Sequence, residues 1–559
     1  MKKNYVLGLA LSAIMLLTAC GGGAKAPDKN EADTKEETKV EETAQTDNGE
    51  NEESAITNSN PLSDKRVRQA LWYAIDMDSI ANDIWSGQVT AANKSLVPEG
   101  DRQADDLIEY KYDPEKAKEL LREANWDPNY KLKAVYYTEN LLDTITAIQA
   151  YWQAVGVNME FQLLKDNLTA QLWTPPADKE NGPSEVDWDI CFAGTNALTL
   201  SEFYTRYSKD AANNSTVPYN EENENLIMNI KTAVTPEEQK KAYDDMQKFQ
   251  NEEVYTMPMF YIPSWIITSD KLDMAGDPVG NDQFNYEKNI VDWKIDRDDN
   301  TMYTNSGAIN SLENPATNPG LYWHQELVFD RLIQANPDLT PSEEGQLAEG
   351  YEVQDDGKTY VFNLHEGVKW HDGEPFTGED VKWTLEYLPT VTGANAIMQE
   401  VYADINEINV DGSTVTVKFN NVQPNALTVF SQWPILPKHL LEKVDPNLFA
   451  ADKFWQKPIG TGPFKVAEVE LGDHTTLERN NDYFVKGEGN IEKIYLYPSD
   501  DSGDSNLVTN VNAGKIDYAF CKDATQIEQL EGVDGYNVER IEVTFPRYAF
   551  FNMFPRKDK

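Results

Sequence analysis

A strand, a helix and a second strand follow one another within one short stretch, and this unit constrains the fold more than any other feature. The strands show alternating apolar residues and the helix shows apolar residues three or four apart: Leu132, Ala134 and Tyr136, then Ile145, Ile148, Trp152 and Val155, then Met159, Phe161 and Leu163. Two strands joined by a crossover helix lie parallel in one sheet. The sequence therefore predicts an α/β fold with a partly parallel sheet.

Helix caps and hairpin turns extend this interpretation to the rest of the chain. Helices are predicted to begin at Asp113-Pro114, at Thr235 with Glu238 three residues on, and at Thr377 with Asp380, and another helix carries the apolar stripe Val67, Ala70, Leu71, Ala74 and Ile75. Asp356-Gly357 and Asp411-Gly412 each separate two alternating runs, which is typical of antiparallel hairpins. We expect parallel and antiparallel strands in the same protein.

The N-terminus looks like an export signal. Lys2 and Lys3 precede the uncharged apolar run 5–19, which is shorter than the roughly 20 residues that span a bilayer. The run ends in Leu-Thr-Ala-Cys20, which resembles the lipobox of bacterial lipoproteins, where the cysteine is acylated by fatty acids such as palmitate. An ordinary signal peptide with a chance cysteine is the alternative. We expect a lipid anchor at Cys20 and no later membrane span.

Residues 21–57 are predicted to be a disordered acidic tether. They contain eleven Asp and Glu, four Lys and no aromatic residue, a composition that cannot bury enough apolar surface to fold. The whole chain has a net charge of −46, which argues against binding to nucleic acid or to an anionic lipid surface. Three Cys and five His exclude a disulfide scaffold and argue against a multi-zinc protein, so no cofactor or metal is predicted.

Motifs that could carry catalysis have better structural interpretations. The run 460–464 is rich in glycine, but no Lys-Ser/Thr follows it, so it is interpreted as a tight turn. His371-Asp372 lies in a predicted strand-to-helix turn, and Cys191 and Cys521 are expected to be buried thiols. No Gly-x-Ser-x-Gly elbow is present. The sequence predicts that the protein is not an enzyme.

Several runs together resemble the family 5 extracellular solute-binding proteins of ABC importers, the oligopeptide-, dipeptide- and nickel-binding group. They are 64–71, 113–117, 350–364, 367–377, 379–381, 460–464, 480–484 and 512–517. The resemblance implies a two-lobe fold of the periplasmic-binding-protein type (type II, cluster C) with an extra domain. The ligand would be enclosed between the lobes by hinge closure.

The order of the matching segments differs from the family order. In the family, the segment that resembles 60–297 follows the segment that resembles 305–559, whereas here it comes first. The sequence therefore predicts a circular permutation, joined through 298–301, which is permissible when the native termini lie close together at the surface. The alternative is a rearranged gene whose product folds poorly or exchanges halves between chains.

This resemblance implies a domain organisation with crossings near Tyr261 and Phe545. We expect a signal peptide at 1–20, the tether at 21–57, lobe 2 (the family's C-terminal lobe) at 58–262, lobe 1 at 263–345 and 456–545, the extra domain at 346–455, and a crossing back to lobe 2 at 546–559.

Candidate ligand residues follow from the resemblance. In peptide-binding relatives, an Asp shortly after an Ala-Gly pair binds the peptide's α-amino group, but here Leu198 lies where that Asp is expected. A buried ammonium without a carboxylate partner is costly, so we expect another mode of recognition. The candidates are Gly194, Thr195, Asn196 and Glu202 on this stretch, and Tyr322 and Trp323 on the facing segment. Packing of both rings under the lobe is the alternative for Tyr322 and Trp323, and His324 alone would make a poor nickel site.

The resemblance implies a monomeric lipoprotein on the extracytoplasmic face of the cell membrane. It would capture peptides or peptide-like solutes, held by backbone hydrogen bonds and aromatic walls, and hand them to the transmembrane subunits of an ABC permease. An extracellular sensor or signalling receptor of the same fold remains an alternative, as does a binding protein for oligosaccharide or nickel. An extracellular hydrolase is disfavoured by the missing catalytic set.

Overall fold

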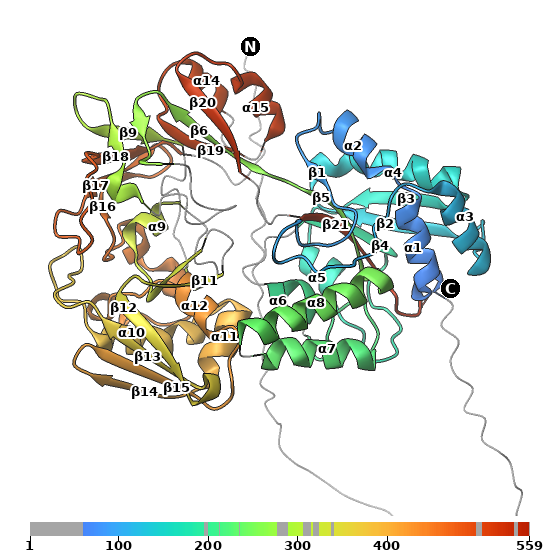
Figure 1. The fold of residues 1–559 in the computed structure, drawn as a ribbon, viewed down its shortest axis with the longest axis horizontal. Helices are drawn as coiled ribbons and strands as arrows, with labels where there is room; N and C mark the ends of the chain where they lie inside the picture. Colours follow the sequence, from blue (N-terminus) through green and yellow to red (C-terminus); the bar gives the residue numbers. More distant parts are fainter. Residues whose placement is uncertain are drawn as a thin grey trace, which may run out of the picture.

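The computed structural model shows two bodies side by side, one around strands β1–β5 and the other around β6 and β9–β20 (Figure 1). It describes residues 60–557 except 195–199, 212, 234, 277–288, 306–314, 317–322, 337–339, 499–505, 522 and 542–545. The predicted signal peptide, Cys20 and the tether lie outside the described residues. Within the described residues, no helix has the length and apolar character needed to cross a membrane.

The body that we call lobe 2 contains a six-stranded sheet. In sheet order its strands are β1 (Thr90–Ala91), β5 (Thr256–Tyr261), β21 (Pro546–Phe551), β4 (Ile190–Gly194), β2 (Lys131–Tyr136) and β3 (Asn158–Leu163). Strands β3, β2 and β4 are parallel, and helix α4 (Leu142–Ala154) connects β2 to β3. The predicted strand–helix–strand unit is therefore confirmed.

Helices cover both faces of this sheet. They are α1 (Lys65–Tyr73), α2 (Met77–Asp83), α3 (Pro114–Glu123), α5 (Leu168–Trp173), α6 (Leu200–Thr205), α7 (Glu221–Thr232) and α8 (Pro236–Glu253). Successive residues of one strand enter different cores, as strand geometry requires: Phe192 packs with residues of α1 and α4, and Cys191 packs with residues of α7 and α8. The predicted caps at Asp113 and Thr235 are present, the latter as a capping box.

Strand β21 comes from the far end of the chain, yet it lies between β4 and β5 in the middle of the lobe 2 sheet. The Asn60 side-chain amide donates to the backbone oxygens of Asn552 (2.7 Å) and Phe554 (2.8 Å). The Asn552 side chain in turn donates to the backbone oxygen of Trp188 (3.0 Å). The beginning and the end of the described chain therefore meet in one buried hydrogen-bonded cluster.

The other body, lobe 1, contains a seven-stranded sheet. In sheet order its strands are β16 (Phe464–Glu470), β17 (His474–Arg479), β18 (Lys493–Leu496), β9 (Thr301–Thr304), β19 (Tyr518–Cys521), β6 (Ser264–Ser269) and β20 (Tyr536–Ile541). Helices α14 (Leu507–Asn512) and α15 (Ala524–Leu530) and the small strands β7 (Leu272–Asp273) and β8 (Lys294–Ile295) complete it. Because β6 and β9 are paired with later strands, the segments before and after the turn at 298–300 share one sheet.

That turn is tied to the sheet by an ion pair whose carboxylate is buried and whose guanidinium is partly exposed. The Arg297 guanidinium donates to both carboxylate oxygens of Asp517, with Nη2–Oδ1 at 2.8 Å and Nε–Oδ2 at 2.9 Å. The Asp517 carboxylate is fully buried and also accepts from the Ser269 hydroxyl (3.1 Å) and the Tyr303 backbone N–H (2.9 Å). The Asp517 side chain, next to β19, thus connects β6 and β9 with Arg297, the residue before the turn.

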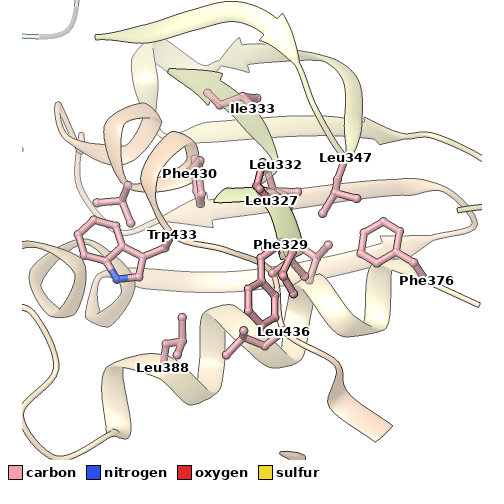
Figure 2. Packing of buried hydrophobic residues seen from close by; sticks show 14 of the residues in the cluster. Leu327, Phe329, Leu332, Ile333, Leu347, Phe376, Leu388, Phe430, Trp433 and Leu436 are labelled. Carbon is pink, nitrogen blue, oxygen red and sulfur yellow. The ribbon is translucent and has the colours of Figure 1, made fainter. Parts of the chain in front are cut away.

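A smaller four-stranded antiparallel sheet lies beside lobe 1. It contains β12 (Ala348–Gln354), β13 (Thr359–Leu364), β15 (Thr414–Phe419) and β14 (Ile405–Asp411), with helices α10 (Gly378–Tyr387), α11 (Ala396–Ala403), α12 (Ala426–Gln432) and α13 (Lys438–Leu441). Both predicted hairpins and the capping box at Thr377 are present. Three elements connect this sheet to lobe 1: helix α9 (Trp323–Val328) and strands β10 (Ile333–Ala335) and β11 (Pro341–Gly345). At this connection Phe329 and Leu436 pack together in one hydrophobic cluster (Figure 2).

The glycine-rich run at 460–464 is a close-packed turn, as predicted. A Cβ on Gly460 or Gly462 would overlap the backbone oxygen of Val328 or Leu327, so the chain can approach this closely only with glycine. His371 lies against the turn, with Nε2 2.9 Å from the Gly462 oxygen and Nδ1 accepting from the Gly460 N–H. The structural interpretation of both motifs is confirmed.

Burial lowers the pKa of His371 to about 4, so the folded protein keeps this imidazole neutral where the unfolded chain binds a proton. Stability should therefore fall as pH decreases from about 6.5 to about 4, by up to about 3 kcal/mol from this residue. Burial also raises the pKa of Asp330 to about 6, which acts in the opposite direction over the same window.

A His371→Gln variant isolates the histidine contribution because Asp330 is present in both proteins. We expect urea unfolding at pH 7 and pH 4.5 to show a smaller acid loss in the variant than in the wild type, by about 2–3 kcal/mol. Equal losses in the two proteins would show that His371 is not held neutral by burial.

Candidate functional site

The carboxyl edge of the parallel strands β2 and β4 is the part of lobe 2 where a ligand site is expected. In open α/β sheets, ligands bind outside the carboxyl ends of the strands. Figure 1 places α6 and the beginning of β21 at the margin of lobe 2 that is nearest lobe 1. The connection from β5 to β6 crosses between the lobes through Ile262 and Pro263.

Gly194, a predicted site residue, ends β4 and forms the floor of this edge. Its backbone oxygen accepts a hydrogen bond from the Tyr137 hydroxyl, at 3.3 Å. The Arg547 side chain from β21 lies directly against it, and a Cβ at position 194 would overlap the guanidinium. Burial is the main reason that the pKa of Tyr137 is raised, so the phenol stays protonated. A side chain at position 194 would therefore have to displace the Arg547 guanidinium.

Arg206 follows α6 and lies on the other side of β21. Its Nε donates to the backbone oxygen of Glu202 (3.1 Å) and its Nη1 donates to the Tyr548 hydroxyl (2.8 Å). Burial works to lower the pKa of Arg206, but the neighbouring Tyr548 and Tyr207 phenols outweigh burial, and the pKa is raised overall. The guanidinium is therefore a permanent positive charge; its two described hydrogen-bond acceptors are neutral oxygens, and the Glu202 carboxylate also stabilises the charge.

The structure describes the predicted ligand residues only in part. Gly194 and the half-buried Glu202 lie on β4 and α6 of lobe 2, at the same edge, while Trp323 begins α9 in lobe 1. Thr195, Asn196, Leu198 and Tyr322 lie outside the described residues. No group of three or more metal-ligating side chains occurs in the described part of the chain.

Three residues at this edge were not predicted from the sequence: Tyr137, Arg206 and Arg547. Local sequence patterns did not indicate that these residues lie at the site. Each of them lies near Gly194 or Tyr548 because strands that are distant in the sequence pair with one another. The one available signal was Arg547, a charged residue at the head of the apolar run 546–551. A separate pocket in lobe 2, lined by Trp72, Tyr204 and Gln250 among others, contains none of the predicted ligand residues.

Comparisons with known proteins agree on one family. The family model for bacterial extracellular solute-binding proteins, family 5 Middle, matches residues 22–215 and 343–558. A putative ABC transporter peptide-binding protein of Brucella ovis is 28% identical over 210 residues, covering 37% of this chain and 39% of that protein. The oligopeptide-binding protein OppA of Bacillus subtilis is 29% identical over 210 residues, covering 34% of this chain and 37% of that protein.

Solved structures give partial matches. NikZ from Campylobacter jejuni in complex with Ni(L-His) is 25% identical with a TM-score of 0.34, covering 40% of this chain and 43% of that chain. AppA from Bacillus subtilis in complex with a nonapeptide is 23% identical with a TM-score of 0.35, covering 42% of this chain and 46% of that chain. Each of these alignments spans less than half of the relative's length.

Proposed function

The chain belongs to the bacterial extracellular solute-binding proteins of family 5, and from this premise we propose that it captures a peptide or peptide-like solute between its two lobes. We further propose that it delivers this solute to the transmembrane subunits of an ABC permease. The peptide-binding names of the Brucella ovis and Bacillus subtilis relatives favour peptides over the nickel complex bound by NikZ.

The observation that carries the proposal is the short crossing between two separately packed sheets. Strand β5 ends at Tyr261 in lobe 2, and β6 begins at Ser264 in lobe 1, so only Ile262 and Pro263 connect the two sheets there. The second crossing runs from Ile541 at the end of β20 to Pro546 at the start of β21. Two short crossings between rigid bodies allow hinge closure around a ligand.

We propose that the ligand touches the Gly194 edge of lobe 2 and the Trp323 region of lobe 1. Gly194, Thr195, Asn196 and Glu202 would present backbone and polar groups, and Tyr322 and Trp323 would supply aromatic walls. Such a combination of apolar walls with a few polar groups suits a peptide, whose backbone needs hydrogen bonds and whose side chains need apolar contacts.

We also propose that the chain is a circular permutant of the family order, with lobe 2 at 58–262, lobe 1 at 263–345 and 456–545, and the extra domain at 346–455. The contact between Asn60 and Phe554 supports this, because it brings together the two ends that the family order would join. The turn at 298–300, clamped by Arg297 and Asp517, supports it at the new junction. An exchange of halves between two chains is the competing arrangement.

Membrane attachment completes the proposed function. Acylation of Cys20 would anchor the protein on the extracytoplasmic face of the cell membrane, and the acidic tether would let the lobes reach the permease. The lipobox resemblance of residues 17–20 supports this.

A thermal-shift panel with the purified protein tests the ligand class. We expect a pool of short peptides to raise the melting temperature by several degrees, because a ligand that binds only the folded state stabilises it. Oligosaccharides and Ni²⁺ should leave the melting temperature unchanged. Stabilisation by a sugar or by Ni²⁺, with none from any peptide pool, would contradict the proposal.

A further inference from the structure

We propose that a small cavity inside lobe 2 is a binding site for one or two structural water molecules, which connect helices α1, α6 and α8. The cavity is lined by Trp72 of α1, Tyr204 of α6 and Gln250 of α8, together with the segment 94–96 and residues of β5. It contains none of the predicted ligand residues, so this inference does not depend on the proposed function.

Three side chains on this cavity bury polar atoms that have no hydrogen-bond partner in the described part of the chain. These atoms are the indole Nε1 of Trp72, the hydroxyl oxygen of Tyr204 and both amide atoms of Gln250. Trp72 is 1% exposed, Tyr204 2% and Gln250 5%. Buried polar atoms in folded proteins nearly always pair with the protein or with ordered water, because an unpaired one is costly to bury. We therefore expect a partner inside the cavity.

The other polar side chains around the cavity are engaged with protein partners. The Gln247 side chain accepts from the Ser95 hydroxyl (3.0 Å) and donates to the Arg102 backbone oxygen (3.0 Å). The Asn251 amide donates to the backbone oxygen of Lys94 (2.8 Å). Gln250 lies on the same helix as these two residues, and it differs from them because neither of its amide atoms is paired.

Tyr204 needs a hydrogen-bond acceptor as well. Burial is the main reason that its pKa is raised, so the phenol stays protonated and keeps its O–H donor. The Ser95 hydroxyl lies near enough to act on the pKa of Tyr204, but no hydrogen bond of normal geometry joins the two groups. The Ser95 hydroxyl instead donates to Gln247 and accepts from the Val97 N–H.

The chemistry of the unpaired atoms identifies the ligand as water. The Trp72 indole and the Gln250 NH₂ can only donate, the Gln250 Oε1 can only accept, and the Tyr204 hydroxyl can do both. An anion would need donors alone and a metal ion acceptors alone, whereas water serves both kinds of group.

The size of the cavity agrees with this choice. Its volume is about 20 Å³. One water molecule needs about 10–15 Å³ of such space and typically makes about three hydrogen bonds. One or two waters therefore fit, and they would satisfy the four unpaired atoms, whereas a solute as large as an amino acid would not fit.

A crystal structure of the purified protein at high resolution tests the site directly, and thermal unfolding tests it in solution. Tyr204→Phe removes one hydroxyl and keeps the ring, and Gln250→Met removes both amide atoms with little change in length. Tyr110→Phe is the matched control for a paired hydroxyl, since the buried Tyr110 hydroxyl donates to the Asn251 backbone oxygen at 2.8 Å. Tyr219→Phe is the control for an exposed hydroxyl.

We expect the wild-type map to show one or two waters within hydrogen-bond distance of Gln250 and of Trp72 Nε1 or the Tyr204 hydroxyl. The Gln250→Met map should lack at least one of them. Tyr204→Phe should lower the melting temperature by about 2–4 °C, as Tyr110→Phe does, because each removes a paired buried hydroxyl. Tyr219→Phe should change the melting temperature by less than about 1 °C.

Two kinds of result would overturn the inference. The first is a wild-type map without water in the cavity, with an organic molecule there, or with Gln250 paired to protein atoms instead. The second is a Tyr204→Phe variant that is at least as stable as the wild type while Tyr110→Phe is destabilised. Removal of a hydroxyl that has no partner relieves a cost, so that sign would show that no water binds Tyr204.

Discussion

Replacement of Asp517 by alanine is expected to unfold lobe 1 at temperatures where the wild type is stable. The variant leaves the Arg297 guanidinium without its carboxylate and leaves the Ser269 hydroxyl and the Tyr303 N–H without their acceptor. Removing one partner of a fully buried ion pair costs about 3–5 kcal/mol, and we expect the lower end of this range because the Arg297 side chain is 20% exposed. That is a large part of the 5–15 kcal/mol by which a typical domain is stable.

Urea unfolding of the purified protein measures this loss. Asp534→Ala is the matched control, because Asp534 is exposed in the same lobe and its replacement should change the free energy of unfolding by less than about 0.5 kcal/mol. An Asp517→Ala variant as stable as the Asp534→Ala control would show that the turn at 298–300 does not depend on this clamp. The junction between the two segments would then need another explanation.

Replacement of Cys20 by alanine is expected to release the protein from the membrane or to block processing of its signal. The acyl chains on this cysteine would provide the only membrane affinity that the sequence predicts, since the run 5–19 is too short to span a bilayer and would be removed with the predicted signal peptide. Fractionation of cells that produce the full chain, followed by detection in membrane, medium and unprocessed pools, measures the result.

Cys521→Ala is the control for this experiment, because Cys521 is buried in the folded body, outside any disulfide in the described part of the chain, and should not affect anchoring. We expect the control to remain in the membrane fraction while Cys20→Ala leaves it almost completely. A Cys20→Ala protein that is processed and still fully retained in the membrane would mean that another anchor exists.

Local sequence patterns predicted much of the fold. The parallel pair β2 and β3, the capping boxes at Thr235 and Thr377 and both Asp-Gly hairpins depend on neighbouring residues, and the structure confirms each of them. The burial of Cys191 and Cys521 is also confirmed. These features are local, or they follow directly from side-chain periodicity.

Features that depend on distant strands were not available from those patterns. The run 546–551 is mostly apolar, as in a buried strand, but its place between β4 and β5 depends on registers such as Tyr548 with Ala193. The arginines of the site are a consequence of that register, because it brings Arg547 to Gly194 and Tyr548 to Arg206. Likewise, nothing near Asp517 in the sequence indicates that it binds Arg297.

Native mass spectrometry of the purified protein, incubated with a pool of short peptides, tests the central claim most directly. We propose that one chain folds into one interleaved two-lobe body and encloses one peptide. We expect the mass of a monomer together with a second species heavier by a single peptide. A dimer as the only folded species, or a monomer that carries no peptide at any peptide concentration, would contradict this proposal.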